Sequence, residues 1–200
     1  MSGSTRISFP ERTVTSESPQ RGQKIPVDVP THITGTMDFA QGAVATVVQS
    51  YDIWAHHMPL LEIHGSEGSL SVPDPNTFGG PVRLRLEDGD AWEDVPLTHD
   101  DQVGRGVGAA ELVSGLVHDR PHRLSAELGY HVLDVMLAFQ DSSESDAHVP
   151  IASRFDPPAP LPAGLPPGVL GEWRWPGGQL SARLQRVALM LTFSPGWWRW

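Results

Sequence analysis

The segment 60–82 constrains the fold most. In it, two short stretches of alternating apolar and polar residues flank a glycine-containing turn, and a proline-rich segment follows the second stretch. The alternation is carried by Leu61, Ile63, Leu70 and Val72. A period of two is typical of β-strands with one solvated face. The pattern predicts a β-hairpin in which Gly65 and Gly68 supply positive φ angles. Pro73 and Pro75 cannot donate a hydrogen bond to a sheet, so we expect the second strand to end before them.

The composition excludes several classes of function. With 24 acidic and 14 basic residues the chain is acidic, which argues against a nucleic-acid partner. It has no cysteine, so disulfides, thiolate catalysis and thiolate metal sites are excluded. No apolar run reaches the length of a membrane span, and residues 1–4 do not resemble the start of a signal peptide. We therefore expect a soluble, cytoplasmic protein with no membrane partner.

The N-terminal half of the chain has the pattern of an antiparallel sheet. Five further segments alternate or are rich in β-forming residues: 5–9, 33–39, 43–50, 82–86 and 92–97. The short links at 40–42 and 87–90 have the length and chemistry of hairpin turns. The polar segment 15–24 is expected to be a long loop. Short links between alternating segments favour antiparallel strands with one solvated face.

Residues from about 101 to 143 change to helical periodicity. A first apolar stripe is formed by Val107, Ala110, Val113 and Val117, and Asp119–Pro121 should stop that helix. Ser125 has the chemistry of an N-cap for a second helix, with Glu127 in its first turn. The stripe of the second helix comprises Leu128, Val132, Val135, Met136 and Phe139. The predicted class is α+β: an open, largely antiparallel sheet with two helices packed on one face.

The domain organisation follows from a change in composition near residue 156. We expect an α+β domain over residues 1–155, a Pro/Gly-rich linker over 156–178, and a Trp/Arg-rich tail over 179–200. A basic, Trp-rich tail is compatible with a membrane-surface or partner-binding segment. The interpretation that we favour is that the tail belongs to no fold, and a shifted reading frame would account for it.

Three patterns that suggest a functional site are weak on inspection. Residues 104–109 match G-x-G-x-x-A, but the polar segment 98–102 precedes them, whereas a dinucleotide-binding turn must follow a buried strand. We expect a loop leading into a helix, with amides able to hold an anion. The nine histidines show no metal-ligand spacing, and the acidic residues of 87–94 belong to a solvated turn. We therefore predict no metal site.

Two long runs resemble a known family. The first is the E-I-x-G-x-E-G-x-L-x-V-P-D-P-N pattern over residues 62–76. The second joins R-G-x-G at residues 105–108 to the segment 119–136, in which Asp119, Leu124 and Gly129 depart from the family pattern. Together with residues 30–35, they resemble the C-terminal domain of the Gfo/Idh/MocA family of nicotinamide-dependent sugar and polyol oxidoreductases. The resemblance covers about residues 2–155.

The resemblance implies a two-part enzyme. Family members bind NAD or NADP in an N-terminal Rossmann domain and use the α+β domain to shape the substrate pocket and to form oligomers. Their catalytic lysine lies in an E-K-P motif, and their acid/base residues lie in a D-x-G-x-H/Y segment. Neither motif occurs in this chain. We therefore expect no catalytic and no cofactor-binding residue here, and a chain that is truncated, with Met1 as an internal start, and inactive alone.

The matched runs also suggest a residual substrate site. In family members, the loop before the first helix and the start of the second face the substrate cleft. The residues here that fall in those runs are Arg105, His122, Arg123, Tyr130 and His131. Arginine and histidine supply fixed donors for sugar hydroxyls and carboxylates, and we expect Arg105 and His131 to approach one concave surface. The structural alternatives are that Arg123 caps the helix or pairs with Glu127, and that His131 is a hydrogen-bonded core residue.

Three hypotheses remain open. The first is a substrate domain that binds a sugar-like molecule only together with a Rossmann domain. The second is a freestanding module for sheet-mediated oligomerisation or ligand binding. The third, an unrelated α+β enzyme, is the least supported. In the first two, we expect a homo-oligomer through the sheet face, because only one of two apolar sets can face the helices: Val44, Thr46 and Val48, or Ala43, Ala45 and Val47.

Overall fold

A computed structural model describes residues 1–165 of the chain. They form two compact units. The first unit contains residues 1–56 and 125–157, and the second contains residues 57–124 and the described residues from 158 onward. Most of the expected linker, and all of the expected tail at 179–200, lie outside the described residues.

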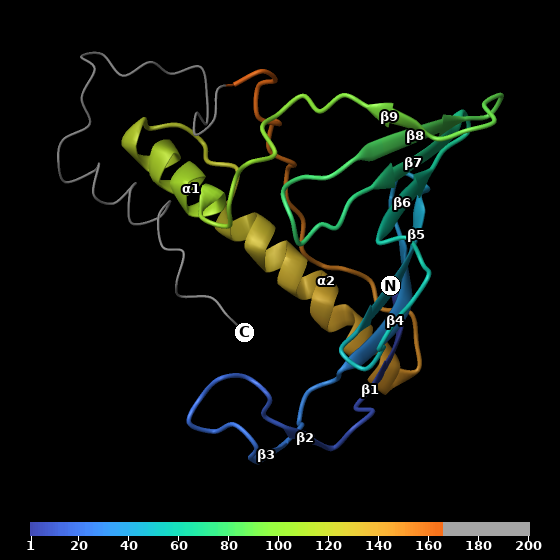
Figure 1. The fold of residues 1–200 in the computed structure, drawn as a ribbon, viewed down its shortest axis with the longest axis vertical. Coiled ribbons are helices and arrows are strands. Elements are labelled where there is room, and N and C mark those ends of the chain that lie inside the picture. Colours follow the sequence, from blue (N-terminus) through green and yellow to red (C-terminus); the bar gives the residue numbers. More distant parts are fainter. Residues whose placement is uncertain (166–200) are drawn as a thin grey trace. The chain divides into compact units, whose positions relative to one another are not determined.

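The fold is α+β with antiparallel sheets and two helices, as predicted (Figure 1). In chain order the elements are β1 (Ser2–Arg6), β2 (Glu11–Thr13), β3 (Lys24–Pro26), β4 (His32–Asp38), β5 (Val44–Ser50), β6 (Leu61–His64), β7 (Gly68–Val72), β8 (Val82–Leu86), β9 (Glu93–Val95), α1 (Val107–Val117) and α2 (Ala126–Ser145). The expected single sheet is divided: the order is β1-β4-β5 in one sheet, β2-β3 in another, and β6-β7-β8-β9 in a third. Residues 51–60, between β5 and β6, form no strand.

In the first unit, helix α2 packs on β1 and β4 (Figure 1). Gly3 of β1 is paired with Gly35 of β4, and Phe139 of α2 lies over both. A Cβ atom added at Gly3 would lie 2.9 Å from a Phe139 ring carbon, and one added at Gly35 would lie 2.6 Å from another. Phe139 and Ala138 are the buried apolar residues among those described. Two glycines therefore make the space in which the helix meets the sheet.

The two edges of this sheet differ. On β1, the amides of Gly3 and Thr5 donate to the hydroxyls of Ser142 and Ser143 at 3.0 Å, so the end of α2 covers that edge. Strand β5 forms the other edge. Since Val47 pairs with Gly35, it lies on the helix side of the sheet, and the alternate residues of β5 point to the opposite face. On that face Val44 and Val48 are 67% and 42% exposed.

The N-terminal elements differ from the sequence prediction. The strand expected at 5–9 is formed by Ser2–Arg6, because these residues pair in register with β4. The loop expected at 15–24 connects the short hairpin β2–β3. Arg12 of this hairpin pairs with Asp52, whose carboxylate also accepts from the Thr31 hydroxyl at 2.6 Å. Hydrogen bonds from the Ser8 and Thr31 side chains, together with Arg12, lower the pKa of Asp52.

The hairpin at 60–72 is confirmed, but the role of its glycines is corrected. Strands β6 and β7 pair with Leu61 opposite Val72 and with Ile63 opposite Leu70, and β7 ends before Pro73. Among the described glycines, positive φ angles occur at residues 22, 42, 80 and 164, not at Gly65 or Gly68. A Cβ atom at Gly68 would lie 2.3 Å from the carbonyl oxygen of Arg85. Gly68 is thus needed for the close approach of β8, not for the turn.

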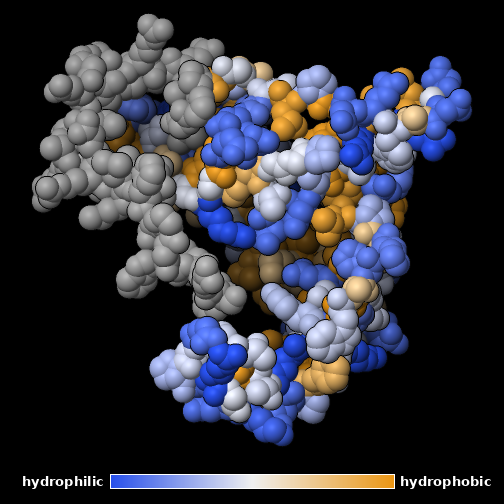
Figure 2. Space-filling model, in the orientation of Figure 1, coloured by the Kyte–Doolittle hydropathy of each residue, from blue (hydrophilic) through white to orange (hydrophobic). Residues whose placement is uncertain are grey.

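The helices begin and end as predicted, but their apolar faces are less buried. Ser125 caps α2 by accepting from the amide of Leu128, and Asp119, with a φ of 48°, follows the end of α1. Within α2, Val132 and Met136 are exposed, although the stripe predicted them to face the sheet. Helix α1 belongs to the second unit, so α2 is the helix that packs on β1 and β4. On the face drawn in Figure 2, hydrophobic residues reach the surface in several orange patches.

Within residues 1–165, neither helix has the combination of length and hydropathy that a membrane span requires.

Candidate functional site

A buried carboxylate organises the second unit. Glu111 lies in the middle of α1, surrounded in sequence by small and apolar residues, and is 5% exposed. The chain turns back after α1, where the amide of Arg120 donates to the carbonyl of Gly115 at 3.0 Å. A Cβ atom at Gly115 would lie 2.6 Å from that of His122, so only glycine lets the returning loop lie against the helix. The loop 118–124 thereby places two arginines beside Glu111.

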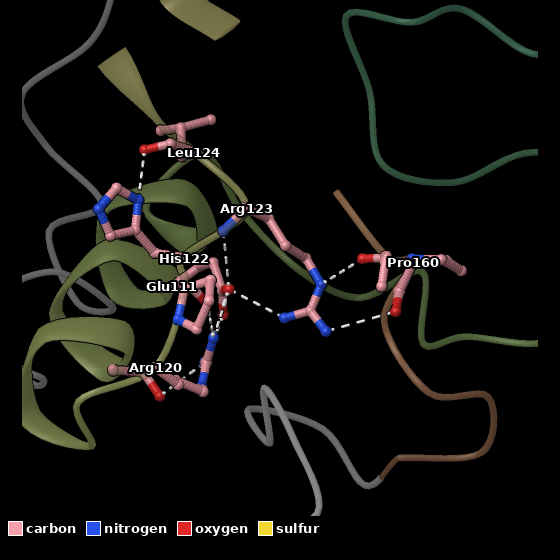
Figure 3. Close-up of polar contacts among 9 residues, drawn as sticks. Glu111, Arg120, His122, Arg123, Leu124 and Pro160 are labelled. Atoms are coloured by element: carbon pink, nitrogen blue, oxygen red, sulfur yellow. Dashed lines mark hydrogen bonds and ion pairs between the residues drawn. The ribbon is translucent and has the colours of Figure 1, made fainter. Parts of the chain in front are cut away.

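The contacts of Glu111 are drawn in Figure 3. Arg120 donates to both carboxylate oxygens, with each N–O distance 2.8 Å. Arg123 donates to Oε1 from its backbone amide at 3.1 Å and from Nη1 at 2.9 Å. Burial raises the pKa of Glu111, but the hydrogen bonds from Arg120 and Arg123 outweigh it and lower this pKa to about 2. The carboxylate is therefore ionised and fully engaged, which suits a structural anchor better than an acid/base group.

Arg123 and His122 make further contacts within the second unit. Arg123 donates from Nε to the carbonyl oxygen of Ala159 at 2.8 Å and from Nη2 to that of Pro160 at 3.3 Å (Figure 3). The His122 ring bonds through Nδ1 to the carbonyl oxygen of Leu124 at 2.9 Å. Arg123 thus pairs with Glu111, where the sequence had offered Glu127 as an alternative.

Arg105 stands at the glycine-rich segment that leads into α1. Its Nη2 donates to the Asn76 side-chain oxygen at 2.6 Å and to the Asn76 carbonyl oxygen at 3.3 Å. No strand precedes the segment 104–106 closely, since β9 ends at Val95, and Gly106 is the helix N-cap. The prediction of a loop leading into a helix is confirmed. The exposed guanidinium of Arg105 is held beside the loop that follows β7.

The first unit holds a second polar group, centred on Ser153. His131 of α2 bonds through Nδ1 to the Ser153 hydroxyl at 2.8 Å, and its ring lies 4.9 Å from that of Phe155 between centroids. The amide of Ser153 donates to the Asp134 carboxylate at 3.0 Å. Hydrogen bonds from Ser153, with a smaller contribution from His131, lower the pKa of Asp134. These contacts fix the segment after α2 to the helix.

Tyr130, the candidate residue next to His131, is 64% exposed.

The five candidate residues fall into two sets. Arg105, His122 and Arg123 lie in the second unit, and Tyr130 and His131 lie in the first. The structure brings His122 and Arg123 together on one loop beside α1, and the convergence of Arg105 with His131 stays a prediction. Sequence reasoning missed Glu111, Asp134 and Ser153. For Glu111 a signal existed, namely a single carboxylate in an otherwise uncharged helix followed by two arginines.

Among residues 1–165, no group of three or more histidine, aspartate or glutamate side chains is placed to hold a metal ion.

Comparison with known proteins gives a fold. No protein-family model and no curated protein matches the chain. Levoglucosan dehydrogenase in complex with NADH matches with a TM-score of 0.57 and 19% identity, over 76% of this chain and 44% of that chain. An oxidoreductase domain protein from Kribbella flavida matches with a TM-score of 0.53 and 19% identity, over 73% of this chain and 44% of that chain. The chain shares the fold of part of these oxidoreductases.

A third match has similar coverage. Levoglucosan dehydrogenase in complex with NADH and L-sorbose matches with a TM-score of 0.56 and 20% identity, again over 44% of its length. The chain therefore spans less than half the length of the solved structures that it matches.

Proposed function

We propose that this chain is the substrate-binding and oligomerisation part of an NAD(P)-dependent sugar or polyol oxidoreductase of the Gfo/Idh/MocA type, truncated and inactive alone. The observation that carries the proposal is the partial fold match: most of this chain corresponds to 44% of levoglucosan dehydrogenase. The sequence runs at 62–76 and 119–136 support the same family independently. The nicotinamide cofactor would then be bound by a Rossmann domain that these 200 residues do not include.

In this proposal the chain supplies hydrogen bonds to a sugar-like molecule. Arg105 offers an exposed guanidinium that Asn76 holds in place, and guanidinium donors suit hydroxyl and carboxylate oxygens. His131 offers an imidazole whose Nδ1 is already bonded to Ser153, which leaves Nε2 for a ligand. Tyr130 adds an exposed hydroxyl on the same helix. We also include His122 and Arg123 in the proposed site, although they bond main-chain carbonyls and Glu111 in the structure.

Cofactor binding tests the proposal first. We expect no NADH or NADPH binding by the isolated chain, because the glycine-rich segment before α1 lacks the buried strand that a dinucleotide site needs. Fluorescence titration with each nucleotide measures this. Micromolar affinity would contradict the proposal.

Ligand binding tests the residues. In an NMR titration with a panel of sugars and polyols, carried out with a Rossmann domain of this family present, we expect binding that Arg105→Ala and His131→Ala each reduce. The matched control is Arg83→Ala, which removes another exposed arginine of the second unit. If all three variants bind like the unsubstituted chain, or if no member of the panel binds, the assignment of these residues is wrong.

The alternative is a freestanding module for sheet-mediated oligomerisation or ligand binding. The exposed face of β5 supports oligomerisation equally in this alternative and in the proposed part of an oxidoreductase. Val44 and Val48 project from an edge strand, which is a surface that a second copy of the chain can cover. Light scattering over a wide concentration range should show association that Val44→Lys/Val48→Lys abolishes. A strictly monomeric chain would contradict the oligomerisation role in both versions. Sugar binding that requires the Rossmann domain then separates the enzyme part from the freestanding module.

A further inference from the structure

The segment after residue 156 has few ways to bind the rest of the protein. Pro157, Pro158, Pro160 and Pro162 have no amide hydrogen, so the main chain there offers mainly carbonyl oxygens. A surface that holds this segment must therefore supply donors. Residues 159–164, which we call the strap, are held by such donors of the second unit.

Three consecutive carbonyls of the strap are occupied. Arg123 donates from Nε to Ala159 at 2.8 Å and from Nη2 to Pro160 at 3.3 Å. His99 bonds through Nε2 to the carbonyl oxygen of Leu161 at 3.0 Å. At the end of the strap, the amide of Gly164 donates to the carbonyl oxygen of Thr98 at 3.0 Å. The recognition is thus directed at the backbone and suits an extended, proline-containing peptide.

Both donor side chains are themselves oriented. Glu111 holds Nη1 and the backbone amide of Arg123, which turns the opposite edge of the guanidinium toward the strap (Figure 3). A carbonyl oxygen can only accept, so the bond to Leu161 requires a proton on Nε2 of His99. In the neutral ring Nδ1 is then an acceptor, and the Thr98 hydroxyl lies 2.9 Å from it and can donate. The donors are therefore prepared for the strap by contacts outside it.

We propose that Arg123 holds the strap against the second unit. The strap and any ligand would then compete for the hydrogen-bond donors of its guanidinium. Arg123 is then a positioning residue, since its three nitrogens are engaged by Glu111, Ala159 and Pro160. An acceptor group of a ligand reaches this side chain only after the strap leaves. This inference goes beyond the proposed function, because it concerns contacts within the second unit and holds whether or not the chain binds a sugar.

Amide hydrogen exchange of the full chain, read at Gly164 by NMR, measures docking of the strap. Arg123→Ala removes two of its bonds, and we expect Gly164 to exchange about 10-fold faster. Arg83→Ala is the matched control, because Arg83 is an arginine of the same unit that pairs with Asp94. In that variant we expect the exchange rate of Gly164 to stay within about threefold of the original.

Two further variants keep the test decisive. Arg123→Lys preserves the charge beside Glu111 but lacks the planar fork, so it should give an intermediate rate. His99→Ala removes the third carbonyl contact without touching the ion cluster, and should accelerate Gly164 even if Arg123→Ala fails to fold. The proposal is overturned if Gly164 exchanges at the original rate in His99→Ala and in a folded Arg123 variant, or if Arg83→Ala accelerates it as much as Arg123→Ala does.

Discussion

The two units hold a helix in different ways. In the first unit α2 lies on a sheet, and an apolar ring rests on two glycines that face each other across β1 and β4. In the second unit α1 is fixed by Glu111, which accepts from two arginines of the loop that follows the helix. One unit is therefore stabilised by close packing, and the other by a satisfied buried charge.

The difference predicts which kind of substitution destabilises each unit. A closely packed contact is destabilised when side-chain volume is lost or added, because the neighbouring residues have little space in which to rearrange. A buried ion cluster is destabilised when one charged residue is removed, because the remaining buried charges lose their ion-pair partner. Both units leave large apolar side chains exposed, such as Val44 in the first and Leu116 in the second. Among residues 1–165, neither unit has a large apolar core that would mask the effect of a single substitution.

The largest expected effect is the loss of the ring of Phe139. Phe139→Ala removes the main buried apolar side chain of the first unit, and we expect it to cost about 3–5 kcal/mol of unfolding free energy. Denaturant unfolding followed by circular dichroism measures this. Tyr130→Ala is the control on the same helix, because that ring is largely exposed. Equal destabilisation by the two variants would contradict the packing described for α2.

Glu111→Gln should have the next largest effect, and on the second unit. The variant keeps the shape but removes the charge shared by Arg120 and Arg123, and we expect a loss of about 3 kcal/mol. Amide exchange in residues 107–124, compared with exchange in α2, locates the effect. If α2 loosens as much as α1, the two units do not respond separately.

The same variant gives a pH test. Glu111 has an ordinary pKa of 4.5 and a folded pKa of about 2, so its stabilisation is present above pH 4.5 and is lost as the pH falls toward 2. Unfolding measured across this window should become less pH-dependent in Glu111→Gln. The lowered pKa values of Asp52 and Asp134 act in the same direction in the first unit, so acid should still destabilise that unit in the variant.

The sequence predicts the local elements well and their assembly poorly. The hairpin β6–β7 and the cap at Ser125 depend on neighbouring residues, and both are confirmed. The contact between Gly3 and Phe139 joins residues far apart in the sequence, and no local pattern marks it. Gly68 was correctly identified as important but for the wrong reason, since its neighbour Arg85 lies on another strand. Division into three sheets also depends on pairing choices that alternation alone does not determine.

For the candidate site, the sequence indicates candidate residues but not the residues that they contact in the structure. Arg123 was expected to contact substrate, with capping or pairing to Glu127 as the structural alternative, and in the structure it pairs with Glu111, twelve positions earlier. The reason is the turn after α1, where Gly115 admits the returning loop. Residues 159–161 were assigned to a linker by composition, and composition does not show that their carbonyls have donors.

Removing the N-cap of α2 should have a smaller effect. Ser125 accepts from the amide of Leu128 at 3.1 Å, and Ser125→Ala should cost about 1 kcal/mol. Helix α1 lacks a side-chain cap, because Gly106 occupies that position. Gly106→Ser therefore offers the converse test, and we expect it to leave stability unchanged or to raise it slightly. Thermal unfolding of both variants measures the contrast, and a Ser125→Ala chain as stable as the original would contradict the cap.

The smallest expected effect is that of an exposed ion pair in the second unit. Arg83 and Asp94 are bonded at 3.1 Å across β8 and β9, and their side chains are 52% and 76% exposed. Water screens such a pair, so Arg83→Ala should cost only about 0.5 kcal/mol. Arg120→Ala, which removes a similar pair at the buried Glu111, should cost several times more in the same unfolding measurement. Equal costs would show that burial does not distinguish the two pairs, and the charge-based account of the second unit would then be wrong.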